Sequence, residues 1–202
     1  MCIRDSKKIK RAISNAKNQC FTANDLEEKA DNHFDKIIAD AYKRYRTSLS
    51  KNNALDFDDL LLLPVFLLRQ NDLVRDYWHK RFQHILVDEY QDTNRTQYEL
   101  IKLITAGNTP PNKFCEWNDR SIFVVGDADQ SIYSFRAADF RILIGFQEDF
   151  KNSSNNDQKA SLVKLEENYR SSSNILNAAN SLIENNTERI DKVLRATKDK
   201  GE

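Results

Sequence analysis

Short runs of apolar residues in the second half of the chain each end in polar or acidic residues. Residues 85–87 and 122–125 form the two clearest runs, and a third, residues 162–165, contains one lysine. An uninterrupted apolar run of this length is typical of a strand buried on both faces, as in a parallel sheet covered by helices. The pattern therefore predicts an α/β fold. In such folds ligands gather at the carboxyl ends of the strands, where these polar residues would lie.

The N-terminal part of the chain has a different pattern. Residues 7–49 are highly charged and contain neither proline nor glycine, and their apolar positions recur at helical spacing, which predicts one long amphipathic helix. The apolar residues at that spacing are Phe34, Ile37, Ile38, Ala41, Tyr45 and Leu49. We expect the aromatic residues among them to face the core, and contact with DNA is the alternative.

Three aspartates precede the next apolar segment. Asp56 can cap a helix whose first turn holds Asp58 and Asp59, where the helix dipole favours negative charge. Capping is a sufficient structural reason for these acids. We expect Pro64 to kink this helix.

Further along, Asn94 is followed three residues later by Gln97, which is close to a capping box. It predicts a helix with a buried face made by four apolar residues, Leu100, Ile101, Leu103 and Ile104. Residues 107–120 form a long loop to which we assign no function.

Polar residues 151–159 have no apolar period and predict a linker at a domain boundary. The helix expected over residues 171–183 has one apolar face, which is a core-packing pattern. That face carries Ile175, Leu176, Ala179, Leu182 and Ile183. Past Asn186 the chain turns basic, and we expect it to reach Glu202 without completing a second core.

Composition narrows the class of protein only slightly. Basic and acidic residues both number 31, so the net charge neither supports nor excludes binding to nucleic acid. The three cysteines show no metal-ligand spacing with one another or with the three histidines, which predicts free thiols in a reducing compartment and no zinc site. Residues 60–68 are too few to span a bilayer, and no signal peptide is visible. We expect a soluble, cytoplasmic protein.

The acid pair that follows the first apolar run can do chemistry. A hydrated Mg²⁺ in proteins takes one or two carboxylates, so Asp88 can hold the ion while Glu89 faces a water. A solvated loop with two acids is the alternative, and these residues alone do not decide between them.

The order of the motifs adds to this interpretation. Five stretches stand in sequence over roughly residues 50–190 and together resemble the UvrD/PcrA/Rep-type superfamily 1 ATP-dependent DNA helicases, including motifs II, III and IV. The stretches are residues 53–60, 85–92, 122–136, 162–171 and 174–180. The resemblance implies a RecA-like P-loop NTPase fold, with a parallel sheet and helices on both faces, preceded by a helical subdomain. It also implies a 3′-to-5′ translocase on single-stranded DNA that unwinds duplexes in repair or replication.

The resemblance implies an order of domains. Residues 1–52 correspond to a helical subdomain, 53–150 to the C-terminal part of a first RecA-like domain, 151–159 to a linker and 160–202 to the start of a second RecA-like domain. Residues 1–6 match nothing and are left out of the fold prediction.

The chain lacks a glycine-rich phosphate loop ending in Gly-Lys-Ser/Thr, and nothing in it resembles motifs V and VI. We therefore expect an internal fragment of a helicase that does not hydrolyse ATP by itself. A subunit of a helicase–nuclease and a non-catalytic DNA-binding module without a phosphate loop are the alternatives.

The resemblance assigns roles around ATP and Mg²⁺. Asp88 holds Mg²⁺ through its water shell, and Glu89 polarises the water that attacks the γ-phosphate. Gln91 extends the network beneath the nucleotide. Gln130 senses the γ-phosphate, and Asp127 supports it.

Two residues of motif IV complete the nucleotide site that the resemblance implies. Tyr169 stacks on the adenine, and Arg170 reaches the γ-phosphate across the domain cleft, where a planar guanidinium suits phosphate oxygens. From its spacing alone, Arg170 could equally be a surface charge.

Three residues of motif III face DNA in the family. Tyr133, Phe135 and Arg136 are implied contacts to single-stranded DNA or to its junction with duplex, and repair proteins are further candidate partners. From spacing alone, the two aromatic residues could be ordinary core residues. The chain departs from the family in two places, with Phe135 where many relatives have tryptophan and Ala137 in place of a usual glycine.

Overall fold

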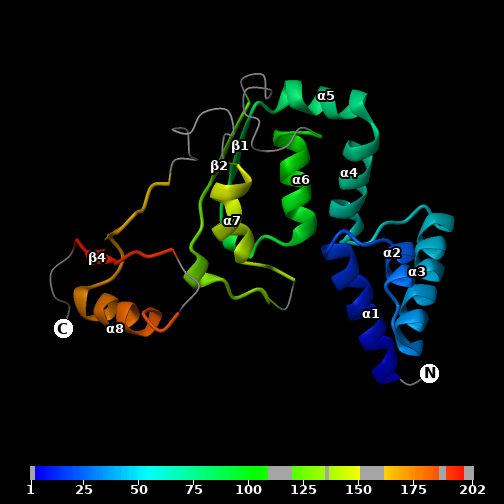
Figure 1. The fold of residues 1–202 in the computed structure, drawn as a ribbon, viewed down its shortest axis with the longest axis horizontal. Coiled ribbons are helices and arrows are strands. Elements are labelled where there is room, and N and C mark those ends of the chain that lie inside the picture. The colour runs from blue at the N-terminus through cyan, green and yellow to red at the C-terminus, as the bar shows by residue number, and fades with distance from the viewer. Residues whose placement is uncertain (1–2, 109–119, 135–136, 151–161, 187–189, 198–202) are drawn as a thin grey trace.

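The computed structural model describes residues 3–108, 120–134, 137–150, 162–186 and 190–197. The chain is a mixture of helices and short parallel strands, and Figure 1 shows α1–α3 at one end, the β1–β2 pair with α4–α7 in the middle, and α8 with β4 at the other end. The expected linker, residues 151–159, and residues 109–119 of the long loop lie outside the described ranges. Within those ranges, no helix is long and apolar enough to cross a lipid bilayer.

The N-terminal region contains three helices, so the prediction of one long helix was wrong. These are α1 (Ile3–Asn18), α2 (Ala23–Glu28) and α3 (His33–Lys51). The first break follows Cys20, whose φ is +63°, and a reciprocal capping box between Thr22 and Asp25 begins α2. The side chain of Asn32 caps α3 by accepting from the backbone N–H of Asp35 at 3.0 Å. Because α1 begins at Ile3, leaving residues 3–6 out of the fold was also wrong.

Helix α3 buries a narrower stripe than expected. Ala39 and Tyr42 are buried on it, whereas Phe34, Ile37 and Tyr45 are exposed. The prediction that the aromatic residues face the core was therefore wrong for Phe34 and Tyr45. Tyr42 is packed by the two preceding helices. Its cluster also contains the buried residues Ile9, Ile13, Ala16 and Ala23.

A buried lysine ties α1 to the start of α4 (Asp59–Gln70). The side chain of Lys17 is 2% exposed, and its ammonium donates to Asp56 Oδ2 and Asp59 Oδ1, each at 2.7 Å. The rings of Tyr42 and Tyr45 lie 5.8 Å and 5.3 Å from the same nitrogen. Asp56 also accepts from the backbone N–H of Asp59, the first residue of α4, at 2.9 Å, although Asp58 is the residue at the N-cap position and makes no cap bond of its own. The acids therefore cap the helix and neutralise Lys17 as well.

The C-terminal end of α1 is also joined to α6 (Arg95–Thr105). The Thr96 hydroxyl donates to the Lys17 carbonyl at 2.6 Å and accepts from the Cys20 backbone N–H at 3.0 Å. The side-chain amide of Asn94 donates to Asn18 Oδ1 at 2.7 Å. The N-terminal helices are thus attached to the middle of the molecule by polar contacts.

The helices of the middle region follow the sequence pattern closely. α4 runs through Pro64 without a break, and whether proline bends it stays a prediction. α5 spans Asp72–Arg81. The capping box of Asn94 and Gln97 at the start of α6 is confirmed, with both bonds at 2.9 Å. Leu103 is buried there, and Leu100 and Ile104 pack partly buried in the same cluster.

The central strands β1 (His84–Val87) and β2 (Ser121–Val124) pair in parallel, as predicted, with Val87 opposite Val124. Val87 and Val124 pack in one core with residues of α6 and α7 (Arg141–Asp149). The opposite face carries Leu86 and Phe123, which are 75% and 61% exposed. The prediction of strands buried on both faces was therefore wrong, because the described helices cover only one face of this pair.

The C-terminal segment contains β3 (Glu167–Asn168), α8 (Ser173–Ile183) and β4 (Arg195–Ala196), with β3 and β4 paired in parallel. Leu176 is buried on α8, but Ile175 and Leu182 are exposed. The predicted core-packing face is thus wrong for those two residues, because within the described ranges nothing covers them.

We predict that Lys17→Met lowers the free energy of unfolding by about 3 kcal/mol, because two largely buried carboxylates lose their counter-charge. Urea unfolding at pH 7 measures this. Lys43→Met is the matched control, since the pair of Lys43 with Glu27 is exposed and should contribute less than about 1 kcal/mol. Equal stability of Lys17→Met and the original chain would contradict the prediction.

The effect of Lys17 should depend on pH. Burial by itself raises the pKa of Asp56, but hydrogen bonds from Lys17, Asp59 and Tyr45 outweigh it and bring the pKa below its usual 3.8. A carboxyl whose pKa is lowered by folding stabilises the protein above its ordinary pKa and loses that contribution as the pH falls through the folded value. The stability difference between Lys17→Met and the original chain should therefore narrow below pH 3.8.

Candidate functional site

The site begins at a strained turn after β1. Asp88 and Glu89 are exposed there, and Glu89 has φ +51° and ψ +39°, a left-handed conformation that is unfavourable for residues other than glycine. The next residue, Tyr90, is fully buried, with its ring edge-on to Phe146 at 5.6 Å. The turn therefore places two carboxylates at the carboxyl end of β1 and an anchoring ring in the core directly behind them.

Gln91 connects this turn to the one that follows β2. Gln91 lies in the short helix η1 (Tyr90–Asp92) and is 2% exposed. The side-chain amide donates to Glu89 Oε2 at 2.6 Å, and its oxygen accepts from the backbone N–H of Asp127 at 3.0 Å. A carboxamide can make both bonds at once, because its NH₂ group donates and its oxygen accepts. Gln91 thus clamps the two strand ends together.

Gly126 lies directly against this clamp. A Cβ at Gly126 would come within 2.7 Å of Gln91 Oε1 and 3.2 Å of the Tyr90 backbone nitrogen. A Cβ fits at those distances only if the bonded Gln91 side chain moves and the two turns separate slightly. The glycine is therefore required by the close approach of the two turns.

The carboxylate of Asp127 is bonded on both oxygens. Oδ2 accepts from the side-chain amide of Gln130 at 2.7 Å, while Oδ1 accepts from the Asp129 backbone N–H at 3.1 Å and from the ammonium of Lys192. Burial by itself raises the pKa of Asp127, but the hydrogen bonds from Lys192 and Gln130 outweigh it and hold the pKa below its ordinary value. Asp127 is therefore charged at neutral pH and orients Gln130, which ends the short helix η3 (Ala128–Gln130).

Asp88 has the properties that a hydrated Mg²⁺ requires. Its Oδ1 accepts from the backbone N–H of Glu89 at 2.9 Å, which fixes the carboxylate, and the residue is exposed. No group of three or more His, Cys, Asp or Glu side chains in the described part of the chain forms a full metal cage. A hydrated Mg²⁺ needs only one or two carboxylates, so the donor set fits this ion.

The predicted DNA contacts are only partly within the described ranges. Tyr133 is 37% exposed, and Phe135 and Arg136 lie outside the described residues. Ala137 has φ +60°, a conformation that glycine adopts without strain. This backbone explains why the family pattern has a glycine where the chain has Ala137.

The predicted motif IV contacts lie on exposed chain after β3. The Tyr169 hydroxyl donates to Glu167 Oε2 at 2.6 Å, and this bond raises the pKa of the phenol. The backbone N–H of Arg170 donates to Asn168 Oδ1 at 2.9 Å, and its side chain is exposed. Among contacts between described residues, none connects Tyr169 or Arg170 to Glu89, so their nucleotide roles stay predictions.

Two residues of the site were missed from the sequence. Lys192 pairs with Asp127 and lies 3.9 Å from Asp129 Oδ2, and the side-chain amide of Asn186 donates to Asp129 Oδ1 at 3.1 Å. Both precede β4 in a stretch that showed only a general basic character. Lys192 and Asp127 are 65 positions apart in the sequence, and no spacing rule predicts a contact over that separation.

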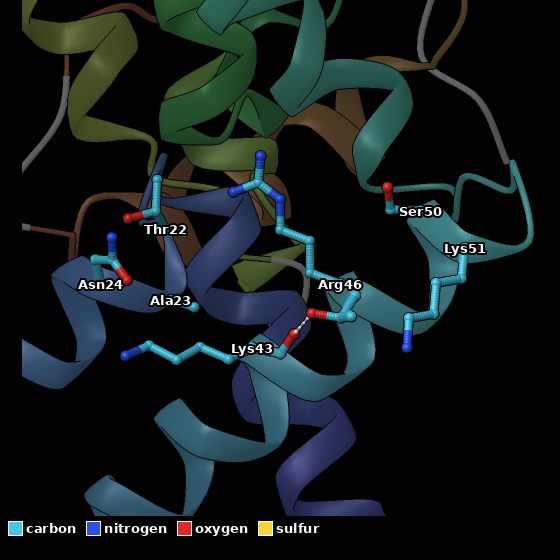
Figure 2. A pocket seen from close by; sticks show the side chains of 8 residues that line it. Thr22, Ala23, Asn24, Lys43, Arg46, Ser50 and Lys51 are labelled. Carbon is cyan, nitrogen blue, oxygen red and sulfur yellow. Dashed lines mark hydrogen bonds between the residues drawn. The ribbon is translucent and has the colours of Figure 1, made fainter.

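A separate pocket of about 590 Å³ lies between α2 and α3, and Figure 2 shows the side chains around it. Its basic lining makes it unsuitable for Mg²⁺, so it is distinct from the acidic site. The lining residues are Thr22, Ala23, Asn24, Lys43, Arg46, Thr47, Ser50 and Lys51. Cations together with hydroxyls suit an anionic ligand.

Comparison with known proteins shows which family the chain is similar to. Residues 3–151 match the family model of the UvrD/REP helicase N-terminal domain, and residues 163–202 match that of the UvrD-like helicase C-terminal domain. The ATP-dependent DNA helicase PcrA of Staphylococcus epidermidis is 43% identical over 178 residues, which is 88% of this chain and 22% of that protein. PcrA of Staphylococcus aureus is 41% identical over 203 residues, 98% of this chain and 25% of that protein. The chain thus spans about a quarter of the length of these relatives.

We predict that Gly126→Ala lowers the free energy of unfolding by about 1–3 kcal/mol, because the added methyl group pushes the two turns apart. Thermal unfolding and hydrogen exchange at the Asp127 amide measure this. Gly145→Ala is the control, because it lies within α7 with nothing within 4 Å of a Cβ, and alanine there should stabilise by up to about 1 kcal/mol. Unchanged protection of the Asp127 amide in Gly126→Ala would contradict the proposed close contact.

Proposed function

Because this chain belongs to the UvrD/REP helicase family, we propose that it is the part of an ATP-dependent DNA helicase that carries motifs II, III and IV. One observation carries the proposal. The buried amide of Gln91 joins Glu89, after β1, to Asp127, after β2, and Asp127 in turn orients Gln130. A 3′-to-5′ direction and a role in repair or replication rest on the family resemblance alone.

We propose a RecA-like fold for the full-length protein. The parallel pairing of β1 with β2 and the carboxylates at their carboxyl ends support it. The exposed face that holds Leu86 and Phe123 would then be covered by a further layer, since the relatives are about four times as long as this chain. The two family models meet between residues 151 and 163, which supports a domain boundary in the predicted linker.

In the proposed reaction, Glu89 is the group that orients the attacking water. Its Oε2 is held by Gln91, which leaves Oε1 to accept from a water. A carboxylate fixed in this way needs no reorientation before it polarises the water. Asp88 would hold Mg²⁺ through water, and the ion would supply positive charge to the phosphates.

The second amide proton of Gln130 is the group proposed to meet the γ-phosphate, since its first is held by Asp127. Tyr169 and Arg170 are proposed to stack on the adenine and to bind the γ-phosphate, and their exposure is consistent with both roles. The phosphate loop that would hold the β- and γ-phosphates is absent from the sequence, so we propose that the chain does not turn over ATP by itself.

We propose that DNA is bound at two places. The first is the aromatic segment of Tyr133, Phe135 and Arg136, on which bases can stack. The second is the pocket between α2 and α3. Arg46 and Lys51 of α3 both line this pocket, and neither joins an ion pair with another described residue. Two such cations suit the phosphates of a nucleic acid.

Two other functions remain as alternatives. A helicase–nuclease subunit would carry a nuclease domain elsewhere in its reading frame, and sequencing the flanking frame identifies it. A non-catalytic DNA-binding module would bind DNA without turnover of ATP.

In the full-length protein, we predict that Glu89→Gln lowers kcat of DNA-stimulated ATP hydrolysis by about 10²–10⁴-fold, because the amide cannot act as a base. The affinity for nucleotide should change little, since size and one accepting oxygen are kept. Steady-state kinetics and equilibrium nucleotide binding measure the two quantities. Glu28→Gln, an exposed carboxylate on α2, is the control. A loss of nucleotide affinity as large as the loss of kcat would show that Glu89 is structural.

For the pocket, we predict that the double substitution Arg46→Gln and Lys51→Gln weakens DNA binding most at low salt. The slope of log affinity against log salt concentration should fall by about 1.4 to 1.8, the value for two lost phosphate contacts. Fluorescence anisotropy at several salt concentrations measures it. Lys36→Gln, on an exposed position of the same helix outside the pocket, should leave the slope unchanged. An unchanged slope in the double variant would remove the pocket from the DNA site.

A further inference from the structure

Lys192 joins the two segments matched by different family models. It lies in the 163–202 segment, and its ammonium donates to Asp127 Oδ1 in the 3–151 segment. Both side chains are about 20% exposed. A pair shielded in this way is screened less by salt than an exposed one. The contact is thus an ion pair between the segments at the edge of the candidate site.

A second contact also joins the 163–202 segment to the turn after β2. Asn186 donates to Asp129 Oδ1 at 3.1 Å, and the side chain of Asp129 is only 6% exposed. Lys192 also lies 3.9 Å from the other oxygen of Asp129. Asn186 and Lys192 therefore bind Asp127 and Asp129. The turn that holds both acids also carries Gln130.

A short chain of hydrogen bonds connects the Lys192–Asp127 pair to Gln130 and Glu89, the proposed catalytic groups. The Asp127 carboxylate that Lys192 binds also holds the amide of Gln130 at 2.7 Å. The Asp127 backbone N–H binds Gln91, whose amide holds Glu89. Without Lys192, the described donors left to this carboxylate are neutral amides, which hold a charge less strongly than an ammonium does.

We propose that Lys192 is a positioning residue for ATP turnover. When the 163–202 segment packs against the 3–151 segment, Lys192 fixes the Asp127 carboxylate. Through Asp127 it also fixes Gln130 and Gln91. The positions of Asp127 and Gln130 in the turn after β2 thereby depend on the packing of the 163–202 segment. This inference rests on the proposed function.

The test uses the full-length protein with Lys192→Met and Lys192→Arg. Lys192→Met should lower kcat of DNA-stimulated ATP hydrolysis about tenfold and leave KM for ATP within about twofold, because Lys192 acts through Asp127. Lys192→Arg, which keeps the charge, should retain most of the activity. Arg195→Met is the matched control, since Arg195 is an exposed cation of the same segment, 3.9 Å from Glu166. A rise in KM equal to the fall in kcat would overturn the inference by making Lys192 a direct phosphate ligand.

A double-mutant cycle separates positioning from a general loss of stability. If Lys192 acts through Asp127, adding Lys192→Met to Asp127→Asn should lower kcat no further than Asp127→Asn does alone. Additive losses overturn the inference, as does a fall in melting temperature with kcat unchanged. An original protein without DNA-stimulated ATP hydrolysis would overturn the proposed function itself. Normal activity of both the original protein and Lys192→Met overturns only the role of Lys192.

Discussion

The buried carboxamide of Gln91 is the contact on which the acidic edge of the sheet depends. One bond holds Glu89 within the same turn, and the other reaches the Asp127 backbone in a turn 36 residues away. Leaving either half of the amide unbonded at this depth would cost about 1–3 kcal/mol. The need for a close approach then dictates a glycine at position 126. The left-handed backbone of Glu89 is part of the same arrangement, since it directs a carboxylate toward Gln91 while Tyr90 enters the core.

Electrostatic pairs join the outer parts of the molecule to its middle region. Lys17 connects the N-terminal helices to α4, and Lys192 connects the C-terminal segment to the turn after β2. Each ammonium is close to two aspartates, and the side chains of Lys17 and Lys192 are 2% and 20% exposed. Such pairs tolerate little change because a lone buried charge is unfavourable. The apolar clusters hold each part together internally, and the polar contacts set how the parts meet.

Local signals in the sequence were enough for part of this structure. The capping box of Asn94 and Gln97 needs only a spacing of three, and the parallel strands follow from two apolar runs that end in acids. The separate helices of the N-terminal region had a local signal as well, Thr22 with Asp25, which the unbroken charged pattern hid. The partners of Lys17 and Lys192 lie 39 to 65 residues away, where no periodicity applies. The exposure of Leu86 depends on which layers cover the sheet, and a strand's own residues do not encode that.

The buried position of Lys17 also bears on how the chain matures during synthesis. Its partners, Asp56 and Asp59, are added 39 and 42 residues later. At about 5–20 residues per second, a ribosome needs roughly 2–8 s to make that stretch. During this interval the ammonium must stay hydrated, so α1 cannot settle into its final place. The apolar stripe of α1 is then open to chaperones or to neighbouring nascent chains until α4 has emerged.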